Sequence, residues 1–445
     1  MAGTSSSETI STRLRQVAEL ARNSPQMVFT TLAHHIDVLL LYEAYQRTRK
    51  DGAVGVDGQT QEEYAPNLSV LAANLKALRD RLKSGTYRAP AVRRAYIPKG
   101  DGKKRPIGIP TFEDKILQRA VTMVLEAVYE QDFKECSYGF RPGRSAHQAL
   151  EVLWDETMEM RGGVVVEVDI QAFFDSLEHR QLRAILNQRV RDGVLRRMID
   201  KWLKAGVLED GEQSYPENGT PQGGVISPLL ANIYLHEVLD RWFEQEVQPR
   251  LEGKAVLVRY ADDFVIVFTS ARDAQRVMAV LPKRFGKYGL SLHPEKTRML
   301  NFQRPRLREP KGLKASFDFL GFTHYWGRSQ KGNWVVKRQT MKKRFGRAVK
   351  AVAQWCRRYR HLPIRAQHEG LVRKLKGHCA YYGITGNAKA LQRFHYELRR
   401  SWQRWLHRRS QRRTMPWDRF ARLLVNYPLP APVAVRSVLR HAARP

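Results

Sequence analysis

Two adjacent carboxylates, Asp262 and Asp263, stand between two mainly apolar runs of the chain, residues 257–260 and 264–268. This pattern predicts a β-hairpin with a tight turn at Ala261, Asp262 and Asp263. Two like charges at a turn between buried strands repel each other, and a divalent cation would neutralise them. For an isolated Asp-Asp pair, an Asx-type turn at the hairpin tip is the alternative.

A third carboxylate, Asp169, favours the metal interpretation. It ends a largely β-branched run, residues 164–168, which predicts a strand buried on both faces. If that strand pairs with the hairpin, Asp169, Asp262 and Asp263 would hold two Mg²⁺ ions, or Mn²⁺ in their place. Two such ions, about 3.5–4 Å apart, stabilise the attacking and leaving oxygens of a phosphoryl displacement. The predicted chemistry is therefore nucleotidyl transfer.

Residues 260–263 (Tyr-Ala-Asp-Asp) and 169–174 together resemble the palm of a reverse transcriptase. Three further blocks, at residues 94–110, 138–145 and 219–233, stand in the order of that family. The sequences of these blocks most resemble those of group II intron-encoded reverse transcriptases (maturases), and the resemblance covers roughly residues 25–430. It implies an α+β right-hand polymerase of fingers, palm and thumb, with a helical, basic carboxy-terminal thumb/maturase (X) domain.

The implied function is an RNA-directed DNA polymerase that binds its parent group II intron RNA, assists splicing and copies the intron into DNA for retrohoming. Its partners would be the intron RNA, a DNA target or primer, and dNTPs. No membrane and no obligate protein partner are indicated. The metal and catalytic residues that the resemblance implies are Asp169, Ile170, Asp262 and Asp263, with Ile170 only in the metal set.

The resemblance also implies nucleotide-binding residues. Residues 96–98 and 105–110 predict two hairpin strands, which would present Lys99 and Arg105 to the triphosphate; a solvated basic hairpin is the alternative. Phe174 would exclude a ribose 2′-hydroxyl, with a core aromatic as its alternative and Phe173 as the better core candidate. The remaining implied contacts to the nucleotide are Gln222 and Lys296.

Composition points to a polyanionic partner. The 445 residues carry a formal net charge of +33, which attracts nucleic acid through phosphate neutralisation. An anionic membrane surface is the competing partner, but no 18-residue apolar run predicts a spanning helix. Cys136, Cys356 and Cys379 are scattered without metal-like spacing, which favours a reducing cytoplasm. The expected location is the bacterial cytoplasm, in association with the nucleoid.

The positive charge is concentrated near the carboxy terminus, where residues 340–413 hold 21 Lys and Arg against two acids. An apolar stripe at helical spacing (Leu391, Phe394, Leu398, Trp402, Trp405) predicts a core-facing helix. The arginines on its other faces are expected to bind RNA. The predicted RNA-binding residues are Arg399, Arg400, Arg404, Arg408 and Arg409, together with Arg141 and Arg144, although a structural salt bridge is the alternative for Arg141.

The expected domain order begins with a flexible lead (1–24) and an amino-terminal extension with the start of the fingers (25–95). Fingers and palm (96–335), the thumb/X domain (336–436) and a tail (437–445) follow. No endonuclease-like segment follows the X domain, which resembles the endonuclease-lacking, class C-like members of the family.

Two other functions fit the same motifs. One is a domesticated group II-like reverse transcriptase in phage defence, spacer acquisition or DNA repair. The other is an RNA-binding splicing chaperone with an incidental polymerase, although the intact carboxylates speak against full loss of polymerase activity.

Overall fold

The computed structural model describes residues 2–98, 104–209, 212–215, 219, 223–306, 315–409 and 414–436. The chain forms two compact units, one of Met1–Glu156 with Gly163–Leu300 (unit 1) and one of Thr157–Gly162 with Asn301–Pro445 (unit 2). The sequence predicts a boundary at residues 335 and 336, whereas the contacts place it at residues 300 and 301. The difference arises because the chain after residue 300 forms a separate small sheet that belongs with the carboxy-terminal helices.

The amino terminus is a helix, and the flexible lead predicted for residues 1–24 is wrong. α1 (Ala2–Asn23) buries Ile10, Val17 and Ala21, with Leu14 packed against the same core. These four positions recur every three or four residues, which is the helical period. The Ser- and Thr-rich start hides this pattern, since Ile10 is the first buried apolar residue of the helix whose side chain the structure describes.

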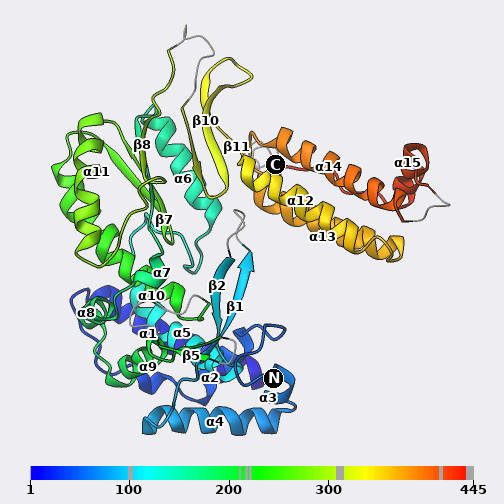
Figure 1. Cartoon of the computed structure of the whole chain (residues 1–445). Helices are drawn as coiled ribbons and strands as arrows, with labels where there is room; N and C mark the ends of the chain where they lie inside the picture. The colour runs from blue at the N-terminus through cyan, green and yellow to red at the C-terminus, as the bar shows by residue number, and fades with distance from the viewer. Residues whose placement is uncertain are drawn as a thin grey trace. The chain divides into compact units, whose positions relative to one another are not determined.

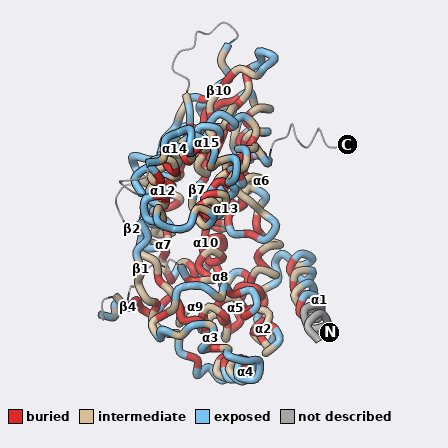
Figure 2. The backbone as a smooth tube through the Cα atoms, turned by 90° about the vertical axis from the view of Figure 1, so that its right-hand side faces the viewer, coloured by how far each residue is buried: buried red, intermediate tan, exposed pale blue. Residues whose placement is uncertain are grey.

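Unit 1 is built around one central helix. Most of α5 (Phe112–Tyr129) is buried, and α1, α2 and α10 pack against it. Figure 2 shows how burial concentrates inside this unit, with exposed backbone around its margin. The other helices of its amino-terminal half are α2 (Val38–Arg47), α3 (Gln61–Tyr64), α4 (Leu68–Ser84), α6 (Ala146–Glu159), α8 (His179–Arg189) and α9 (Gly193–Leu203), with the short η1 (Ala33–His35).

A four-stranded sheet of unit 1 contains the predicted basic hairpin. β1 (Val92–Pro98) and β2 (Lys104–Ile109) pair antiparallel, with Ile97 opposite Arg105. β4 (Val207–Glu209) and β5 (Glu212–Ser214) extend it in the order β2-β1-β4-β5. The two predicted hairpin strands are confirmed, whereas the turn between them, with Lys99, lies outside the described residues.

A second sheet has the order β6-β7-β3-β8, and Figure 1 shows its strands β7 and β8 beside α11. Its strands are β6 (Ala255–Tyr260), β7 (Asp263–Phe268), β3 (Val164–Asp169) and β8 (Arg298–Asn301). The first five residues of β3 are buried, which confirms the predicted fully buried strand. The helical segments around it are α7 (Phe173–Ser176), α10 (Ser227–Leu235) with its π-helical continuations η2 (His236–Arg241) and η3 (Phe243–Val247), η4 (Gln248–Arg250) and α11 (Ala271–Gly286).

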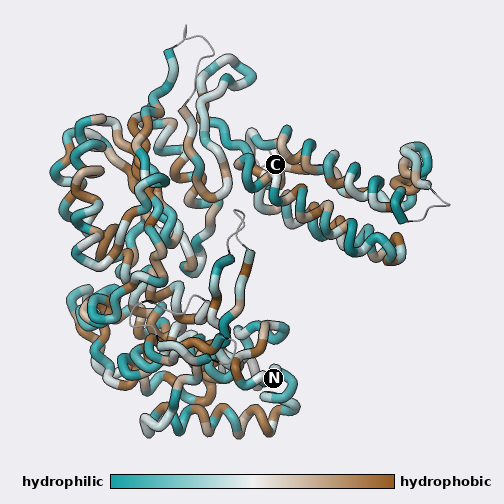
Figure 3. The backbone as a smooth tube through the Cα atoms, viewed as in Figure 1, coloured by the Kyte–Doolittle hydropathy of each residue, from teal (hydrophilic) through white to brown (hydrophobic). Residues whose placement is uncertain are grey.

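Unit 2 joins a three-stranded sheet, in the order β11-β10-β9, to a group of helices. Leu391, Phe394, Leu398 and Trp402 are buried as predicted, whereas Trp405 is half-buried and Leu406 completes the core face. Figure 3 shows that hydrophilic residues cover much of these helices and alternate with apolar residues along each one. The elements are β9 (Ser316–Phe319), β10 (Phe322–Arg328), β11 (Trp334–Thr340), α12 (Lys342–Arg358), α13 (Ile364–Tyr382), α14 (Ala388–His407) and α15 (Trp417–Asn426).

Candidate active site

The three predicted carboxylates lie at one end of the β6-β7-β3-β8 sheet and are called here the acidic corner. Asp169 on β3 stands opposite Asp263 on β7, and Tyr260 on β6 also stands opposite Asp263. Directly opposed residues of antiparallel strands present their side chains on the same face. Ala261 and Asp262 form the turn, where Ala261 has a φ of 56°, the left-handed value that tight hairpin turns use. The predicted hairpin is therefore confirmed.

The electrostatics of the acidic corner favour a bound cation. Burial raises the pKa of Asp262 above its usual value, and the nearby carboxylate of Asp169 raises it further. The positive charges of Arg105 and Arg259 act in the opposite direction. A cation between Asp169 and Asp262 would relieve their repulsion and favour the charged form of both.

A segment after α11 runs beside the end of β3 and carries Lys296 to the acidic corner. The N–H of His293 donates to the carbonyl oxygen of Asp169 at 2.8 Å, and the N–H of Gln171 donates to that of Ser291 at 2.8 Å. Lys296 Nζ lies 3.1 Å from Asp169 Oδ2. Both side chains are half exposed, so this ion pair is weak and open to exchange with a bound cation or phosphate.

The turn of the acidic corner is held from beneath by Arg259, whose side chain is fully buried. Its guanidinium forms a bidentate pair with Asp240, at 2.7 and 2.5 Å. It also donates to the carbonyl oxygen of Ala261 at 3.0 Å and to Ser137 Oγ at 2.7 Å. A planar guanidinium with five donors suits such a task, because it fixes several acceptors at once. Arg259 therefore links the turn to the π-helical segment η2, through Asp240, and to the loop that contains Ser137.

A second support of the turn comes from Asn232 and Gly139. Asn232 accepts from Arg259 at 3.0 Å and donates to the carbonyl oxygen of Gly139 at 2.7 Å. A Cβ on Gly139 would lie 2.3 Å from the backbone nitrogen of Ala261, so only glycine fits there. The N–H of Tyr138 donates to the carbonyl oxygen of Arg259, and the N–H of Arg259 donates to the carbonyl oxygen of Cys136. The segment that carries Gly139 therefore runs beside Arg259.

The residues at the acidic corner suit Mg²⁺ by their chemistry. Hard cations prefer oxygen ligands, and Mg²⁺ usually takes one or two carboxylates plus phosphates and water. Among the described residues, no group of three or more His, Cys, Asp or Glu side chains is arranged to hold a metal unaided. Ile170 has an apolar side chain and can offer only its carbonyl oxygen. The β-bridge between Ile170 and Leu292 is made by the carbonyl oxygen of Asp169 and the N–H of Gln171. The carbonyl oxygen of Ile170 takes no part in this bridge.

Several predicted nucleotide-binding residues lie around this corner. Arg105 is exposed near the start of β2. Phe173 is buried, as predicted, and Phe174 is half-buried with its ring centroid 5.3 Å from that of Phe173. A Cβ on Gly219 would lie 2.8 Å from the carbonyl oxygen of Phe174. The block of residues 219–233, called here the Pro-Gln-Gly block after residues 221–223, therefore begins next to Phe174. Gln222 lies outside the described residues.

The comparisons with known proteins agree with this geometry. The model of the reverse transcriptase (RNA-dependent DNA polymerase) family matches residues 97–324, which include the acidic corner. The group II intron-encoded protein LtrA of Lactococcus lactis subsp. cremoris is 31% identical over 469 residues, covering 86% of this chain and 75% of LtrA. The chain belongs to the group II intron-encoded reverse transcriptases.

Two further relatives of this reverse transcriptase match mainly one part of it. Protein YkfC of Escherichia coli (strain K12) is 39% identical over 241 residues, which cover 48% of this chain and 62% of YkfC. Nuclear intron maturase 2, mitochondrial, of Arabidopsis thaliana is 30% identical over 254 residues, covering 46% of this chain and 34% of the relative. The chain thus spans less than two thirds of YkfC and three quarters of LtrA. Assignment to the class C-like subgroup stays a prediction.

The structure places Arg141 of this reverse transcriptase in the structural role that sequence reasoning left as the alternative. Its side chain is buried and donates to Glu130 Oε2 at 3.0 Å and to the carbonyl oxygens of Lys134 and Ser137 at 2.8 Å. These contacts inside the fold favour the structural alternative, and the RNA contact of Arg141 stays a prediction. Arg144 is more accessible and pairs with the exposed Glu135 at 2.5 Å.

The predicted RNA-binding arginines of α14 lie mostly on the surface. Arg400, Arg404, Arg408 and Arg409 are exposed, whereas Arg399 is half-buried. Arg409 donates to the carbonyl oxygen of His361 at 3.2 Å. These arginines therefore stand opposite the buried stripe of the same helix, as its periodicity predicts.

Sequence reasoning missed the residues that support the turn. Arg259 is a charged residue inside an apolar strand, and such a charge needs a buried partner. That signal was available, but nothing local in the sequence identifies Asp240 or Asn232 as the partner.

As for membranes, none of the helices in the described part of the chain has the length and apolarity that a bilayer crossing requires.

Proposed function

We propose that this protein is an RNA-directed DNA polymerase that also binds its parent group II intron RNA, assists its splicing and copies it into DNA. In this proposal the β6-β7-β3-β8 sheet is the palm, the β1–β2 hairpin belongs to the fingers, and α12–α15 form the thumb and maturase (X) domain. The observation that carries the polymerase assignment is the pairing of Asp169 with Asp263, beside Asp262, within the stretch that matches the family.

The proposed reaction is attack of a primer 3′-hydroxyl on the α-phosphate of a dNTP, with pyrophosphate as the leaving group. No side chain is needed as a nucleophile. Asp169 and Asp262 would hold two Mg²⁺ ions, or Mn²⁺, with Asp263 assisting and Ile170 contributing its carbonyl oxygen. When bound, such ions neutralise charge on the attacking and leaving oxygens. The protein's part is to hold these oxygens in place, which is what the buried Arg259 network supports.

Nucleotide selection is assigned to residues around the acidic corner. Arg105, with Lys99, would bind the triphosphate, and the effect of the Arg105 charge on the pKa of Asp262 supports its nearness to the corner. Lys296 would release Asp169 when the nucleotide binds and pair with a phosphate instead. Phe174 stands on Phe173 beside the Pro-Gln-Gly block, which supports its role as the residue that clashes with a ribose 2′-hydroxyl.

RNA binding is assigned chiefly to unit 2. The exposed arginines of α14 lie on a helix with few acids, so their charge faces solvent and attracts phosphate. Arg144 is a further proposed contact in unit 1, which would have to exchange Glu135 for a phosphate. Structured RNA is recognised largely through such phosphate contacts and through stacking on aromatic and arginine planes.

The test of the polymerase assignment is Asp262→Ala. Loss of this carboxylate should abolish cDNA synthesis on a primed RNA template, because one metal ligand is missing, while RNA affinity stays within about threefold because the arginines of α14 are untouched. Asp80→Ala, a surface carboxylate on α4 paired with Arg79, is the matched control and should keep full activity. Equal loss of synthesis and RNA affinity in Asp262→Ala would contradict the separation of roles.

The test of the intron assignment is the RNA that accompanies the protein. The full-length protein is purified from its host, and the bound RNA is sequenced. One dominant transcript that contains this reading frame within a ribozyme would support the maturase role. Diverse RNA, or RNA from a neighbouring locus without a ribozyme, would leave the polymerase and remove the splicing role.

A further inference from the structure

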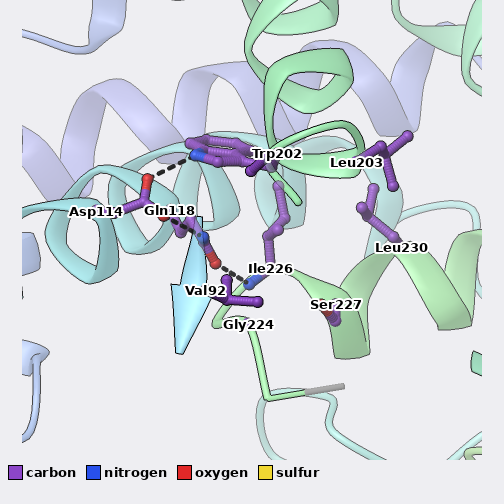
Figure 4. A pocket seen from close by; sticks show the side chains of 10 residues that line it. Val92, Asp114, Gln118, Trp202, Leu203, Gly224, Ile226, Ser227 and Leu230 are labelled. Atoms are coloured by element: carbon purple, nitrogen blue, oxygen red, sulfur yellow. Dashed lines mark hydrogen bonds between the residues drawn. The ribbon is translucent and has the colours of Figure 1, made fainter. Parts of the chain in front are cut away.

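Helix α5 carries two buried polar side chains that the proposed chemistry does not use. Asp114 and Gln118 stand one helical turn apart and are 1% and 3% exposed. Buried polar groups of this kind are costly unless they are hydrogen-bonded. Their partners come from three other parts of unit 1, and Figure 4 shows two of these partners, Trp202 and Ile226, beside a small pocket.

The hydrogen bonds among these residues run in one direction. Asp114 Oδ1 accepts from the hydroxyl of Tyr87 at 2.9 Å and from Trp202 Nε1 at 2.6 Å. Its other oxygen, Oδ2, accepts from Gln118 Nε2 at 2.9 Å. Because a carboxylate only accepts, it fixes which end of the Gln118 amide faces it.

The other end of the amide meets residues 225 and 226 of the Pro-Gln-Gly block. Gln118 Oε1 accepts from the backbone N–H of Val225 at 2.7 Å and from that of Ile226 at 3.3 Å. These N–H groups stand just before α10, where Ile226 is the N-cap and makes no side-chain cap. The first N–H groups of a helix lack intrahelical partners. Gln118 supplies an acceptor there from a different helix.

The same segment is confined on its other side by the basic hairpin. Gly223 has a φ of 118°, and a Cβ there would lie 2.5 Å from the carbonyl oxygen of Gly108 and from Ile107 Cγ2 on β2. Residues 223–226 therefore lie between the backbone of β2 and the amide of Gln118. A shift of the amide would therefore move this part of the Pro-Gln-Gly block.

We propose that Asp114 and Gln118 are positioning residues for the incoming nucleotide. They hold residues 223–226 of the Pro-Gln-Gly block, which the proposed function places against the nascent base pair. Asp114 touches neither nucleotide nor metal and acts only through the orientation of the Gln118 amide. The inference rests on the proposed polymerase function, which assigns the nucleotide contact to that block.

The direction of the hydrogen bonds provides a sharp test. In Asp114→Asn, the side-chain oxygen still accepts from Tyr87 and Trp202, but its amide now donates toward Gln118. Gln118 must turn and present its own NH₂ to the N–H groups of Val225 and Ile226, so two donors face each other. In Gln118→Glu, two carboxylates face each other instead. Each single variant leaves buried hydrogen-bonding groups mismatched, for which we expect the KM for dNTP to rise about tenfold with a smaller change in kcat.

The double variant Asp114→Asn/Gln118→Glu again places a donor opposite an acceptor between positions 114 and 118. The new amide at position 114 donates to the new carboxylate at position 118, whose second oxygen accepts from Val225 and Ile226. We expect its KM for dNTP to return to within about threefold of the wild-type value, since the two sites interact directly and their effects are not additive. Gln118→Met, which keeps the length of the side chain but removes the acceptor, should stay impaired.

Three measurements are made on each full-length variant: single-nucleotide incorporation at varied dNTP, affinity for the primed template, and the unfolding midpoint in urea. The proposal is overturned if the single variants lower stability or kcat while the KM for dNTP stays unchanged, because the role would then be structural only. It is also overturned if the double variant is no better than the worse single variant. A wild-type protein without polymerase activity would refute the proposed function instead, so the two failures are distinguishable.

Discussion

Arginine has two opposite uses in the two units of this protein. In unit 1, Arg259 and Arg189 are buried, and each uses its guanidinium to join an acid to several backbone or side-chain acceptors. In unit 2, Arg400 and Arg404 on α14 and Arg408 at its carboxy-terminal cap are exposed. The buried guanidinium fixes geometry, whereas the exposed one attracts a polyanion. The net charge of +33 counts both kinds alike, so only the partners reveal which arginine has which task.

The largest effect is expected where a buried arginine is removed. Arg259→Met leaves Asp240 as an unpaired buried charge, which should lower the free energy of unfolding by about 3–5 kcal/mol. It also frees the carbonyl oxygen of Ala261, and a misplaced catalytic group costs roughly 100-fold in rate. Urea unfolding and primer extension measure the two losses.

The double variant Arg259→Met/Asp240→Leu separates stability from turn geometry. Replacing a buried ion pair with apolar residues of similar size is often neutral for stability. We therefore expect most of the unfolding free energy to return while DNA synthesis stays low, because no donor then holds Ala261. If synthesis recovers together with stability, Arg259 serves only the fold and the contrast between the units is weaker than proposed.

How far the sequence predicts this structure depends on whether the signal is local. The hairpin around Asp262, the buried strand that ends in Asp169 and the apolar stripe of α14 were predictable, since each follows from a short period. The Arg259–Asp240 pair and the Gln118 contact to Val225 were not, because they join residues 19 and 107 positions apart. Helix α1 was missed because its apolar positions are few and start late.

The second prediction concerns the exposed arginines. Changing Arg400, Arg404, Arg408 and Arg409 to Gln should weaken RNA binding about tenfold or more at moderate salt. It should also reduce the slope of log affinity against log salt by up to about 3, the value for four phosphate contacts to a single strand. Stability should change by less than about 0.5 kcal/mol per residue, as is usual for surface sites. Filter binding at several salt concentrations measures the slope.

A matched control removes the same charge from unit 1. Arg47, Arg79, Arg241 and Arg272 each pair with a nearby acid, so their field is already partly cancelled. Changing these four to Gln should alter the salt slope much less than the change in α14. An equal reduction in both variants would mean that RNA responds to net charge alone, and the assigned surface on α14 would be wrong.

The smallest effect concerns a buried acid of unit 1 that is held by neutral donors. Burial raises the pKa of Asp114 to about 6, although the hydrogen bonds from Tyr87, Trp202 and Gln118 oppose the shift. The folded protein therefore binds this proton more tightly than the unfolded chain, where the pKa is near 3.8. Stability from this group is present at low pH and is lost as the pH rises through about 6.

Comparison with Asp114→Asn isolates that contribution, because every other titrating group is common to both proteins. From pH 5 to pH 7, the unfolding free energy of the wild type should fall by about 1 kcal/mol relative to the variant. Urea unfolding at pH 5, 6 and 7 measures the difference. A constant difference would mean that Asp114 titrates as an ordinary acid. A difference of the predicted sign would show that unit 1 retains a buried charge without a cation to pair it, as the proposed orientation of the Gln118 amide requires.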